Sequence, residues 1–434
     1  CRFMSTEIEK LRFLTRDLAL EVADTVGTPA YVYDYATLKK QAENALAFPN
    51  AFGLTARFAM KASPNAAILR LFDSMGMHFD CSSVHEVKRA VAAGVAPSKC
   101  SLSSQELAEG FEKLVEQGVK INCCSILQLE KFCAKCPGQE LGLRFNPGVG
   151  SGGTGKTNVG GPSSSFGIWH EYADKCSEIA KAAGCKVVRI HTHIGSGSDP
   201  EVWRRCTRLS IGLVSKFPEV SVLNLGGGYK VARMSHEKGT TLETDCAVVK
   251  EVFEEFAKTD EHKRKLHMEI EPGTYLVANA GALVASVHDV VQTGTAEGHT
   301  FIKLDAGMTE VLRPSLYGAQ HPLVIVPRDP AREAERNKYV VCGHCCESGD
   351  LLSPAPGEPE TLSERLLCGA VPGDVCVVEG SGAYCSGMCT KNYNSFPEAP
   401  EVMLVGGKLH VVRARQPVED IWKNEAPLPA DATA

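Results

Sequence analysis

The sequence predicts an α/β barrel of eight βα units, built like a TIM barrel, followed by an all-β C-terminal domain. Between about residues 30 and 280, short apolar runs alternate with helical stretches, which is typical of a parallel sheet. No G-x-G-x-x-G fingerprint follows the first run, although an open dinucleotide-binding sheet would carry one there. After residue 280 the apolar segments are short and separated by Gly and Pro, as in all-β domains.

Eight apolar runs are the expected barrel strands. They cover residues 57–61, 77–81, 100–104, 119–124, 141–146, 187–195, 220–228 and 266–273. The stretches between them, such as "SVHEVKRAVAAG" and "ELAEGFEKLVEQG", carry apolar residues at helical spacing and close with Gly, a common helix stop. Eight such units in roughly 250 residues suit a closed barrel.

The domain organisation follows from the same pattern. We expect the barrel over residues 30–280 and the β-rich domain over residues 281–434, with residues 1–29 packing on the second domain. Residues 149–169, between the fifth and sixth strands, are too rich in Gly and Ser to pack as a regular element. A long loop at the rim of a barrel is expected to act as a lid.

Composition and charge argue against several classes of protein. The net charge of -6 and the pI near 6.2 disfavour a nucleic-acid or anionic-membrane partner. No apolar run reaches the roughly 18 to 20 residues of a membrane span, and the start "CRFMSTEIEK" has no secretory hydrophobic core. The 18 cysteines are scattered, which favours reduced thiols in a reducing compartment, the cytoplasm or a plastid.

Barrel enzymes carry their chemistry at the carboxyl ends of the strands. The polar residues at these ends are Lys61, Asp80, Arg144, His193, Gly226, Gly227, Gly228 and Glu271. A lysine that is partly desolvated beside other charges suits covalent capture of a carbonyl, although a lone rim lysine more often simply extends into water. The triple glycine lets backbone N–H groups approach a phosphate, although a tight turn alone would also explain it.

Three residues near the strand ends have open interpretations. His191 and His193 are two residues apart in a strand and share a face, so their spacing is compatible with a metal pair. The sequence offers no obvious third ligand, and Gly195-Ser196 is typical of an anion-binding loop, so we expect no metal. Glu271 ends the last strand and is followed by Pro272, and a solvated acid at the rim is the simpler alternative.

The stretch "CGHCCESGD", residues 342–350, begins with the spelling of a disulfide oxidoreductase motif. Such a motif opens a helix in a thioredoxin-like βαβ unit, whereas this one ends an apolar run in the β-rich region. Cys133 and Cys136 form a second Cys-x-x-Cys pair, and the two pairs together could bind zinc. We expect neither function, because a short motif in the wrong context usually arises by chance.

Eight motifs together resemble one known family. "FAMKASPN", "HFDCSSVHE", "HTHIGSG", "LGGG", "EIEPG", "RPSLYGA", "CESGD" and "EGSGAY…NYNS" occur in the order found in fold-type III pyridoxal-phosphate-dependent decarboxylases, which are related to alanine racemase and ornithine decarboxylase. The similarity covers nearly the whole chain, and eight ordered motifs are far more specific than any one of them. It points most closely to the branch that acts on diaminopimelate.

The resemblance implies pyridoxal 5'-phosphate as the cofactor, carried by Lys61. His193 is implied to stack on the pyridine ring and Glu271 to pair with the ring nitrogen, where a carboxylate favours the protonated form. Asp80 and Glu86 match acidic positions near the lysine. The residues implied around the phosphate are Ser196, Gly226, Gly227, Gly228, Gly273, Thr274 and Tyr384, the last of which is also implied in substrate binding.

The resemblance also implies a homodimer with shared active sites, in which the β-rich domain reaches the partner's site. Cys346 is implied to stand near the reacting Cα as a proton donor, with Glu347 binding a substrate ammonium and Ser348 beside it. Arg313 and Tyr317 match positions that bind the distal carboxylate of the substrate, and an arginine fork suits a carboxylate. A structural salt bridge is the alternative role for Arg313.

Two positions depart from the family pattern. Relatives commonly have Arg after "EPG", where this chain has Thr274, and "NSRP", where this chain has Phe396. The first change removes a cation from the expected clamp on the distal carboxylate. Arg313 alone, or Lys156 in the expected lid, is expected to supply the charge that remains.

The activity that the resemblance implies is decarboxylation of meso-2,6-diaminopimelate to L-lysine and carbon dioxide, the last step of lysine biosynthesis. The missing arginine keeps open another basic amino acid, namely ornithine, lysine or arginine, as the substrate. An activity like that of alanine racemase fits "CESGD" and "RPSLYGA" less well. A catalytically inactive regulatory homologue is the third alternative, and it is disfavoured by the presence of Lys61, His193, Glu271 and Cys346.

Overall fold

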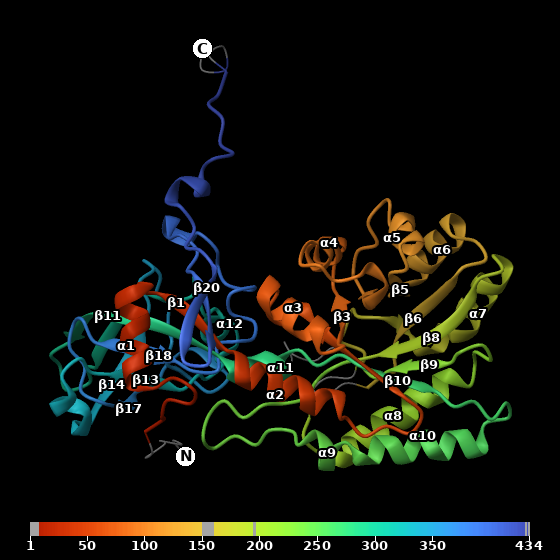
Figure 1. Cartoon of the computed structure of the whole chain (residues 1–434), viewed down its shortest axis with the longest axis horizontal. Coiled ribbons are helices and arrows are strands. Elements are labelled where there is room, and N and C mark those ends of the chain that lie inside the picture. The colour runs from red at the N-terminus through yellow and green to blue at the C-terminus, as the bar shows by residue number, and fades with distance from the viewer. Residues whose placement is uncertain (1–7, 150–159, 194–196, 430–431, 433–434) are drawn as a thin grey trace. The chain divides into compact units, whose positions relative to one another are not determined.

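The computed structural model of the chain describes residues 8–149, 160–193, 197–429 and 432. Two compact units make up the chain (Figure 1): one is Ala36–Asn279, and the other combines Cys1–Tyr35 with Ala280–Ala434. Ser196, Lys156 and residues 150–159 of the expected lid lie outside the described residues. Within the described residues, no helix has the length and apolar character needed to cross a membrane.

The unit Ala36–Asn279 is a closed barrel of eight parallel strands, as predicted. The barrel strands are β2 (Leu54–Ala59), β3 (His78–Cys81), β4 (Cys100–Leu102), β5 (Lys120–Cys123), β6 (Glu140–Asn146), β8 (Lys186–Thr192), β9 (Val222–Asn224) and β10 (His267–Ile270). Each strand pairs with the next, and β10 pairs back with β2, which closes the ring. A short strand, β7 (Ile168–Trp169), adds to β6.

Several strands end earlier than predicted. The expected strands over residues 187–195 and 220–228 end at Thr192 and Asn224. Gly226 and Gly228 have positive φ angles of 69° and 102°, a conformation that cannot continue a strand, so the glycine run forms a turn. The functional residues that follow these strands therefore lie in loops at the carboxyl end of the barrel.

The helices of the barrel unit begin shortly after the strands end. They are α2 (Tyr35–Leu46), α3 (Ala66–Ser74), α4 (Val84–Ala92), α5 (Glu112–Glu116), α6 (Ile126–Lys135), α7 (Ala173–Ala182), α8 (Pro200–Val214), α9 (Leu242–Asp245), α10 (Ala247–Thr259) and α11 (Thr274–Val277). Side-chain caps fix several starts: Asn65 accepts from the Ala67 N–H at 2.8 Å, and Ser83 accepts from the Glu86 N–H at 3.1 Å. These caps keep the connections at the carboxyl end short.

The barrel interior contains a buried ion cluster rather than only apolar side chains. Glu269 on β10 contacts Arg57 on β2 at 2.7 Å and Arg189 on β8 at 3.0 Å, and all three side chains are at most 7% exposed. Both arginines hydrogen-bond to the carboxylate, so the charges compensate one another inside the barrel. The cluster ties three strands together beneath the strand ends.

The other unit is built on a mixed nine-stranded sheet. Its elements are α1 (Arg16–Thr25), β1 (Ala30–Asp34), β11 (Gly281–Gln292), β12 (Thr300–Leu304), α12 (Arg313–Tyr317), β13 (Leu323–Val326), β14 (Asn337–Cys342), β17 (Arg365–Leu367), β18 (Val375–Val378), β19 (Glu401–Val405) and β20 (Lys408–Arg413), with β15 (Pro354–Ala355) and β16 (Glu358–Leu362) as a separate pair. β1 lies between β11, to which it is antiparallel, and β19, to which it is parallel.

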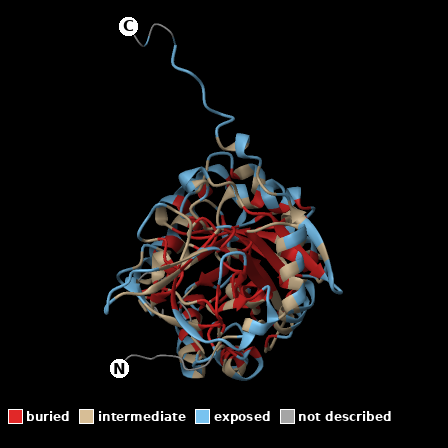
Figure 2. Ribbon diagram, turned by 90° about the vertical axis from the view of Figure 1, so that its left-hand side faces the viewer, coloured by how far each residue is buried: buried red, intermediate tan, exposed pale blue. Residues whose placement is uncertain are grey.

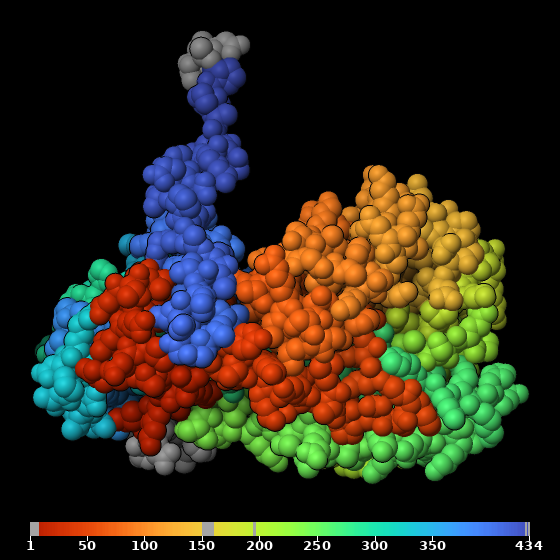
Figure 3. All heavy atoms as spheres, in the orientation of Figure 1, coloured from red at the N-terminus to blue at the C-terminus, as the bar shows by residue number. Residues whose placement is uncertain are grey.

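The core of this unit forms where helix α1 packs on the sheet. Ala19 and Val22 of α1 join Val32, Val284 and Val377 in one buried cluster. Figure 2 shows buried residues running along the strands, with exposed residues on the outer helices and loops. The described residues after β20 are mostly exposed, and the last of them run outward from their own unit as an extended segment (Figure 3).

Candidate active site

The carboxyl ends of the barrel strands bring the predicted polar residues together. Lys61 lies in a single 3-10 turn (Met60–Ala62) after β2, Asp80 is in β3, and His193 and Glu271 follow β8 and β10. The electrostatic neighbours of Asp80 are Lys61, Glu86, Arg144 and Glu271, and three of these also act on His193. One rim of the barrel therefore carries a lysine, a histidine, an arginine and several carboxyl groups.

Glu271 has a nitrogen neighbour at each carboxylate oxygen, one through a hydrogen bond and one within ion-pair distance. Asn224 Nδ2 donates to Oε1 at 2.7 Å, and His191 Nε2 lies 3.1 Å from Oε2. Burial opposes ionisation, but His191 and then His193 and Arg144 outweigh it, so the pKa of Glu271 is held well below its usual range. Glu271 is a buried carboxylate that stays charged, and not the solvated rim acid of the simpler alternative.

His193 stays neutral at the same rim. Desolvation, followed by the charges of Arg144 and Lys61, lowers its pKa to about 3. Its Nδ1 accepts a hydrogen bond from the Gly227 N–H at 2.9 Å, which fixes the orientation of the ring. A neutral imidazole offers a flat face for stacking without adding charge to the site.

The glycine turn is packed too closely to accept a side chain. A Cβ on Gly227 would collide with the Glu271 carbonyl oxygen, and a Cβ on Gly226 would collide with the His193 ring. The N–H groups of these two glycines donate to His193 and to Asn224 Oδ1. Because these two N–H groups are already used within the protein, a phosphate at this turn would depend on Gly228 and on Gly273, which caps α11.

Asp80 and Glu86 differ although both are acidic residues near Lys61. Asp80 is buried and its Oδ1 has no hydrogen-bond partner. Desolvation and then the nearby Glu271 charge raise the pKa of Asp80 to about 8, so this carboxyl group holds a proton at neutral pH. Glu86 accepts from the Ser82 N–H at 2.6 Å and so helps to cap α4, which gives it a structural role.

Three residues that shape this site were not predicted as site residues in these roles. Asn224 and His191 contact Glu271, and Glu269 is the centre of the ion cluster. Their signal is the alternation of a strand, because His191 and Glu269 each precede a predicted site residue by two positions and share its face. That spacing shows a shared face but does not show which side chain contacts which.

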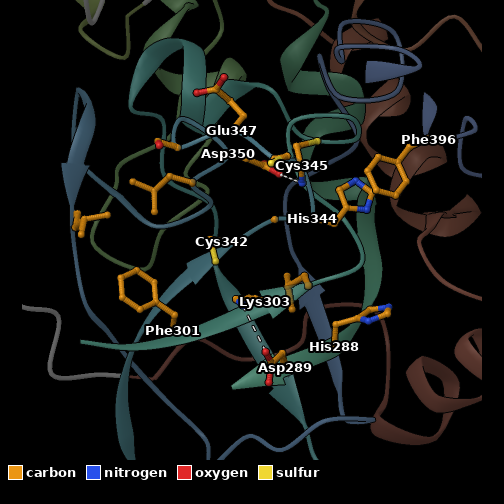
Figure 4. A pocket seen from close by; sticks show the side chains of 16 residues that line it. His288, Asp289, Phe301, Lys303, Cys342, His344, Cys345, Glu347, Asp350 and Phe396 are labelled. Atoms are coloured by element: carbon orange, nitrogen blue, oxygen red, sulfur yellow. Dashed lines mark hydrogen bonds and ion pairs between the residues drawn. The ribbon is translucent and has the colours of Figure 1, made fainter. Parts of the chain in front are cut away.

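The predicted loop residues Cys346, Glu347 and Ser348 lie in the other unit and are exposed. They belong to the loop after β14, which Asp350 holds in place: its carboxylate accepts from the Cys345 N–H at 2.8 Å and the Met308 N–H at 2.7 Å. The loop borders a pocket of about 820 Å³ that also touches β11, β12 and β14 (Figure 4).

A second loop is fastened to the first by a ring stack. Phe396 lies flat against His344, with centroids 3.7 Å apart and an interplanar angle of 14° (Figure 4). Asn394 Oδ1 accepts from the Cys346 N–H at 3.0 Å. Asn394 and Ser395 also have positive φ angles of 51° and 60°, which are strained for residues other than glycine. Phe396, the departure from the family pattern, therefore packs directly on the loop that carries Cys346.

The predicted carboxylate-binding residues lie on or near α12 in the same unit. Arg313, the first residue of α12, contacts His321 Nε2 at 3.0 Å, and His321 Nδ1 lies 2.9 Å from the Glu379 carbonyl oxygen. Tyr317 ends the helix, and Tyr384 has a positive φ of 57°. The contact with His321 thus orients the Arg313 guanidinium.

The context of the thiols disfavours redox chemistry at the "CGHC" motif. The motif ends strand β14 and continues as a loop, with no helix after it, as expected. Burial raises the pKa of Cys342, and burial together with the Asp350 carboxylate raises the pKa of Cys345 to about 12. Thiol exchange needs the thiolate, so these cysteines are poor nucleophiles near neutral pH.

Comparisons with known proteins agree with the motifs. Residues 37–278 match the family described as "Pyridoxal-dependent decarboxylase, pyridoxal binding domain". The diaminopimelate decarboxylase of Escherichia coli (strain K12) is 32% identical over 94% of this chain and 96% of its own length. That of Streptomyces coelicolor is 31% identical over 92% and 89%.

Solved structures give the same result. A crystal structure of diaminopimelate decarboxylase superposes with a TM-score of 0.87 at 30% identity, covering 96% of this chain and 97% of that one. The diaminopimelate decarboxylase from Helicobacter pylori complexed with L-lysine gives a TM-score of 0.79 at 26% identity, covering 93% and 98%. A lysine/ornithine decarboxylase from Vibrio vulnificus shares the fold, with a TM-score of 0.75 at 21% identity over 92% and 100%.

The barrel rim has the donor set that pyridoxal phosphate requires. The exposed Lys61 supplies an amine, Glu271 a buried ionised carboxylate, and His193 a flat neutral ring. The buried Oδ1 of Asp80 has no partner, as expected for a polar atom that faces a bound group. The chain belongs to the pyridoxal-dependent decarboxylases, in one family with the diaminopimelate decarboxylases that it matches along almost its whole length.

Proposed function

We propose that this chain is a pyridoxal-phosphate-dependent carboxy-lyase that converts meso-2,6-diaminopimelate to L-lysine and carbon dioxide, the last step of lysine biosynthesis. The observation that carries the proposal is the match to diaminopimelate decarboxylases over 94% of the chain, with both units included. A match confined to the barrel would support the cofactor chemistry but not the substrate.

The barrel residues prepare the site for loss of a carboxylate. When bound, pyridoxal phosphate supplies an electron sink for the electron pair that remains at Cα. Lys61 holds the cofactor, and the ionised Glu271 keeps a proton on its ring nitrogen. His193 would stack on the ring, and Gly228, Gly273 and the neighbouring backbone would receive the phosphate, together with Ser196, Thr274 and Tyr384.

Residues of the other unit bind the substrate and return the proton. Arg313, with Tyr317 beside it, binds the distal carboxylate, and its contact with His321 supports this because it directs the guanidinium. Glu347 receives the distal ammonium and Ser348 lies beside it. Cys346 gives a proton to Cα after carbon dioxide has left. Thr274 contributes no charge, so Arg313 carries the carboxylate clamp.

We infer that the enzyme is a homodimer whose active sites are completed by loop residues 342–350 of the partner. The exposure of Cys346, Glu347 and Ser348 supports this, because residues that serve a partner's site lie on the surface of their own subunit. We also infer a reducing compartment such as the cytoplasm. The 17 described cysteines form no disulfide, which agrees with it.

Carbon dioxide release tests the proposal directly. The cofactor-loaded protein is offered meso-2,6-diaminopimelate, L-ornithine, L-lysine and L-arginine separately, and we expect turnover of the first with L-lysine as product. Lys61→Ala should lower turnover on the order of a thousandfold or more, because the residue that holds the cofactor is lost. Lys88→Ala, on the exposed face of α4, is the matched control and should keep full activity.

Each contrary result has a definite meaning. Preference for a substrate without a distal carboxylate would contradict the assigned substrate and make Thr274 the mark of a changed specificity. Normal activity in Lys61→Ala would contradict the cofactor assignment. If none of the four amino acids is turned over, the assigned decarboxylase activity is wrong, and an inactive regulatory homologue is favoured.

A further inference from the structure

Two residues inside the barrel contact the carboxylate of Glu271 from different sides. Asn224 on β9 donates to Oε1 at 2.7 Å, and His191 on β8 lies 3.1 Å from Oε2. Asn224 is 0% exposed, His191 is 1% exposed and Glu271 is 6% exposed, so water does not compete for these contacts. Because the two nitrogen atoms come from different strands, these contacts restrain the plane of the carboxylate as well as its position.

Asn224 joins Glu271 to the ion cluster and to the glycine turn. Its amide nitrogen has two hydrogens and lies near two acceptors, Glu271 Oε1 at 2.7 Å and Glu269 Oε2 at 3.2 Å. Its amide oxygen accepts from the Gly226 N–H at 2.8 Å. Every hydrogen-bonding group of this amide is therefore directed at a residue of the site or its support.

His191 is held in turn by a polar chain on its far side. Its Nδ1 lies 3.4 Å from Oγ of Ser103, which follows β4, a strand separated from β8 by β5 and β6 in the ring. Ser103 Oγ accepts from Asn122 Nδ2 at 2.9 Å. All three residues are buried. The imidazole is thus set between Ser103 and Glu271, and its ring cannot turn without breaking a contact.

The neighbouring carboxylate of Glu269 explains why Glu271 can still pair with a cation at the rim. Glu269, two residues earlier on the same face of β10, takes up Arg57 and Arg189 at 2.7 and 3.0 Å. The two guanidinium groups are thereby directed to Glu269. Glu271 meets an amide and an imidazole instead, so its charge remains to face a cation at the rim.

We propose that His191 and Asn224 are positioning residues that fix both oxygens of Glu271 and so present its carboxylate to the protonated ring nitrogen of the cofactor. The inference rests on the proposed function, because it takes Glu271 to face that nitrogen. It goes further by assigning the control of ring protonation to two buried residues of β8 and β9, which would act through Glu271.

The test compares two changes at His191. His191→Leu fills the space without a polar nitrogen, and we expect kcat to fall roughly ten- to hundredfold, the cost of one lost polar contact with a charged group, with little change in KM. We also expect a shifted absorption maximum of the bound cofactor, because the ring nitrogen is protonated to a smaller extent. His191→Gln keeps a donor and should recover most of both signals.

A double variant separates positioning from general damage. In a Glu271→Gln background the ring nitrogen has already lost its anionic partner, so adding His191→Leu should change kcat and the spectrum by less than twofold. His267→Gln is the matched control, because this half-buried barrel histidine contacts Thr55 at 2.8 Å at the start of β10. Its spectrum should equal that of the wild type.

The outcomes distinguish this inference from the proposed function. If Glu271→Gln itself leaves kcat and the cofactor spectrum unchanged, the assigned role of Glu271 is wrong. If Glu271→Gln lowers both while His191→Leu changes neither, the positioning role of His191 is wrong and the proposed function stands. If the two changes lower kcat additively in the double variant, the positioning role of His191 is also wrong. Thermal unfolding of each variant shows whether it has folded.

Discussion

Three carboxyl groups near the barrel rim differ in protonation because their partners differ. Glu269 has two arginine partners, which outweigh desolvation and lower its pKa to about 2. Desolvation and then the nearby Glu271 charge raise the pKa of Asp80, whose Oδ1 has no partner, to about 8. Glu271 stays ionised through His191 and other neighbours. The residue type is almost the same in each case, so the surrounding donors decide which group carries charge.

Replacing Glu269 tests how much the barrel depends on the buried ion cluster. Glu269→Gln leaves Arg57 and Arg189 without a counter-charge, and we expect a loss of about 3 to 5 kcal/mol in the free energy of unfolding. Glu255→Gln, which breaks an exposed pair with Arg208, should cost less than about 1 kcal/mol. Thermal or denaturant unfolding of both variants measures the difference, and equal losses would contradict the prediction.

The same cluster gives the stability a pH dependence with a definite sign. The folded pKa of Glu269 is about 2, below the ordinary value of 4.5, so the folded state binds fewer protons between these values. Its stabilisation is therefore complete above about pH 4.5 and is lost as the pH falls through about 2. The Glu269→Gln variant should lack this part of the acid dependence.

At the scale of elements, the glycine turn after β9 admits no side chain. We expect Gly227→Ala to lower kcat/KM at least about tenfold, because the new methyl group meets the Glu271 carbonyl and strains the packing around His193. Gly212→Ala, in the last turn of α8, meets nothing and should stabilise the fold by at most about 1 kcal/mol with unchanged activity. Steady-state kinetics and thermal unfolding of the pair provide the comparison.

The stack of Phe396 on His344 is expected to hold the loop that bears Cys346. Phe396→Ala removes a contact worth about 0.5 to 1.5 kcal/mol, and we expect kcat to fall roughly two- to tenfold as the loop loosens. Phe396→Tyr keeps the ring and should behave like the wild type. If alanine and tyrosine at this position give the same kcat, the stack does not position the loop.

The sequence allows the barrel and the rim residues to be predicted, and the limits lie in contacts between distant residues. Alternation of apolar runs locates the strands, and the rule for barrel sites locates Lys61, His193 and Glu271. The pairing of Asn224 with Glu271, or of Phe396 with His344, joins residues 47 and 52 positions apart and has no local signature. The same limit explains why β9 ends at Asn224, earlier than predicted. The turn after it depends on how its glycines pack against Glu271 and His193, which lie far away in the sequence.

For the whole molecule, the proposed homodimer with shared active sites predicts complementation between two inactive variants. Lys61→Ala and Cys346→Ala change residues of different units, so a mixed dimer of the two would contain one intact site. Random mixing should restore about a quarter of wild-type activity, because half of the dimers are mixed and each has one working site of two. Either variant alone stays nearly inactive, and mixtures that remain inactive would contradict the sharing of sites.

Strand β1 has a consequence for the way the chain is made. Residues 30–34 leave the ribosome long before their partners, because Tyr31 pairs with Leu283 on one side and Glu401 on the other. The barrel segment is complete well before β19 is synthesised, and domains generally fold as they emerge. The first strand of the sheet must therefore wait, with unpaired backbone groups, through most of translation. A chaperone that binds extended segments would act between the synthesis of β1 and that of β19. It would protect mainly the N-terminal part of the chain.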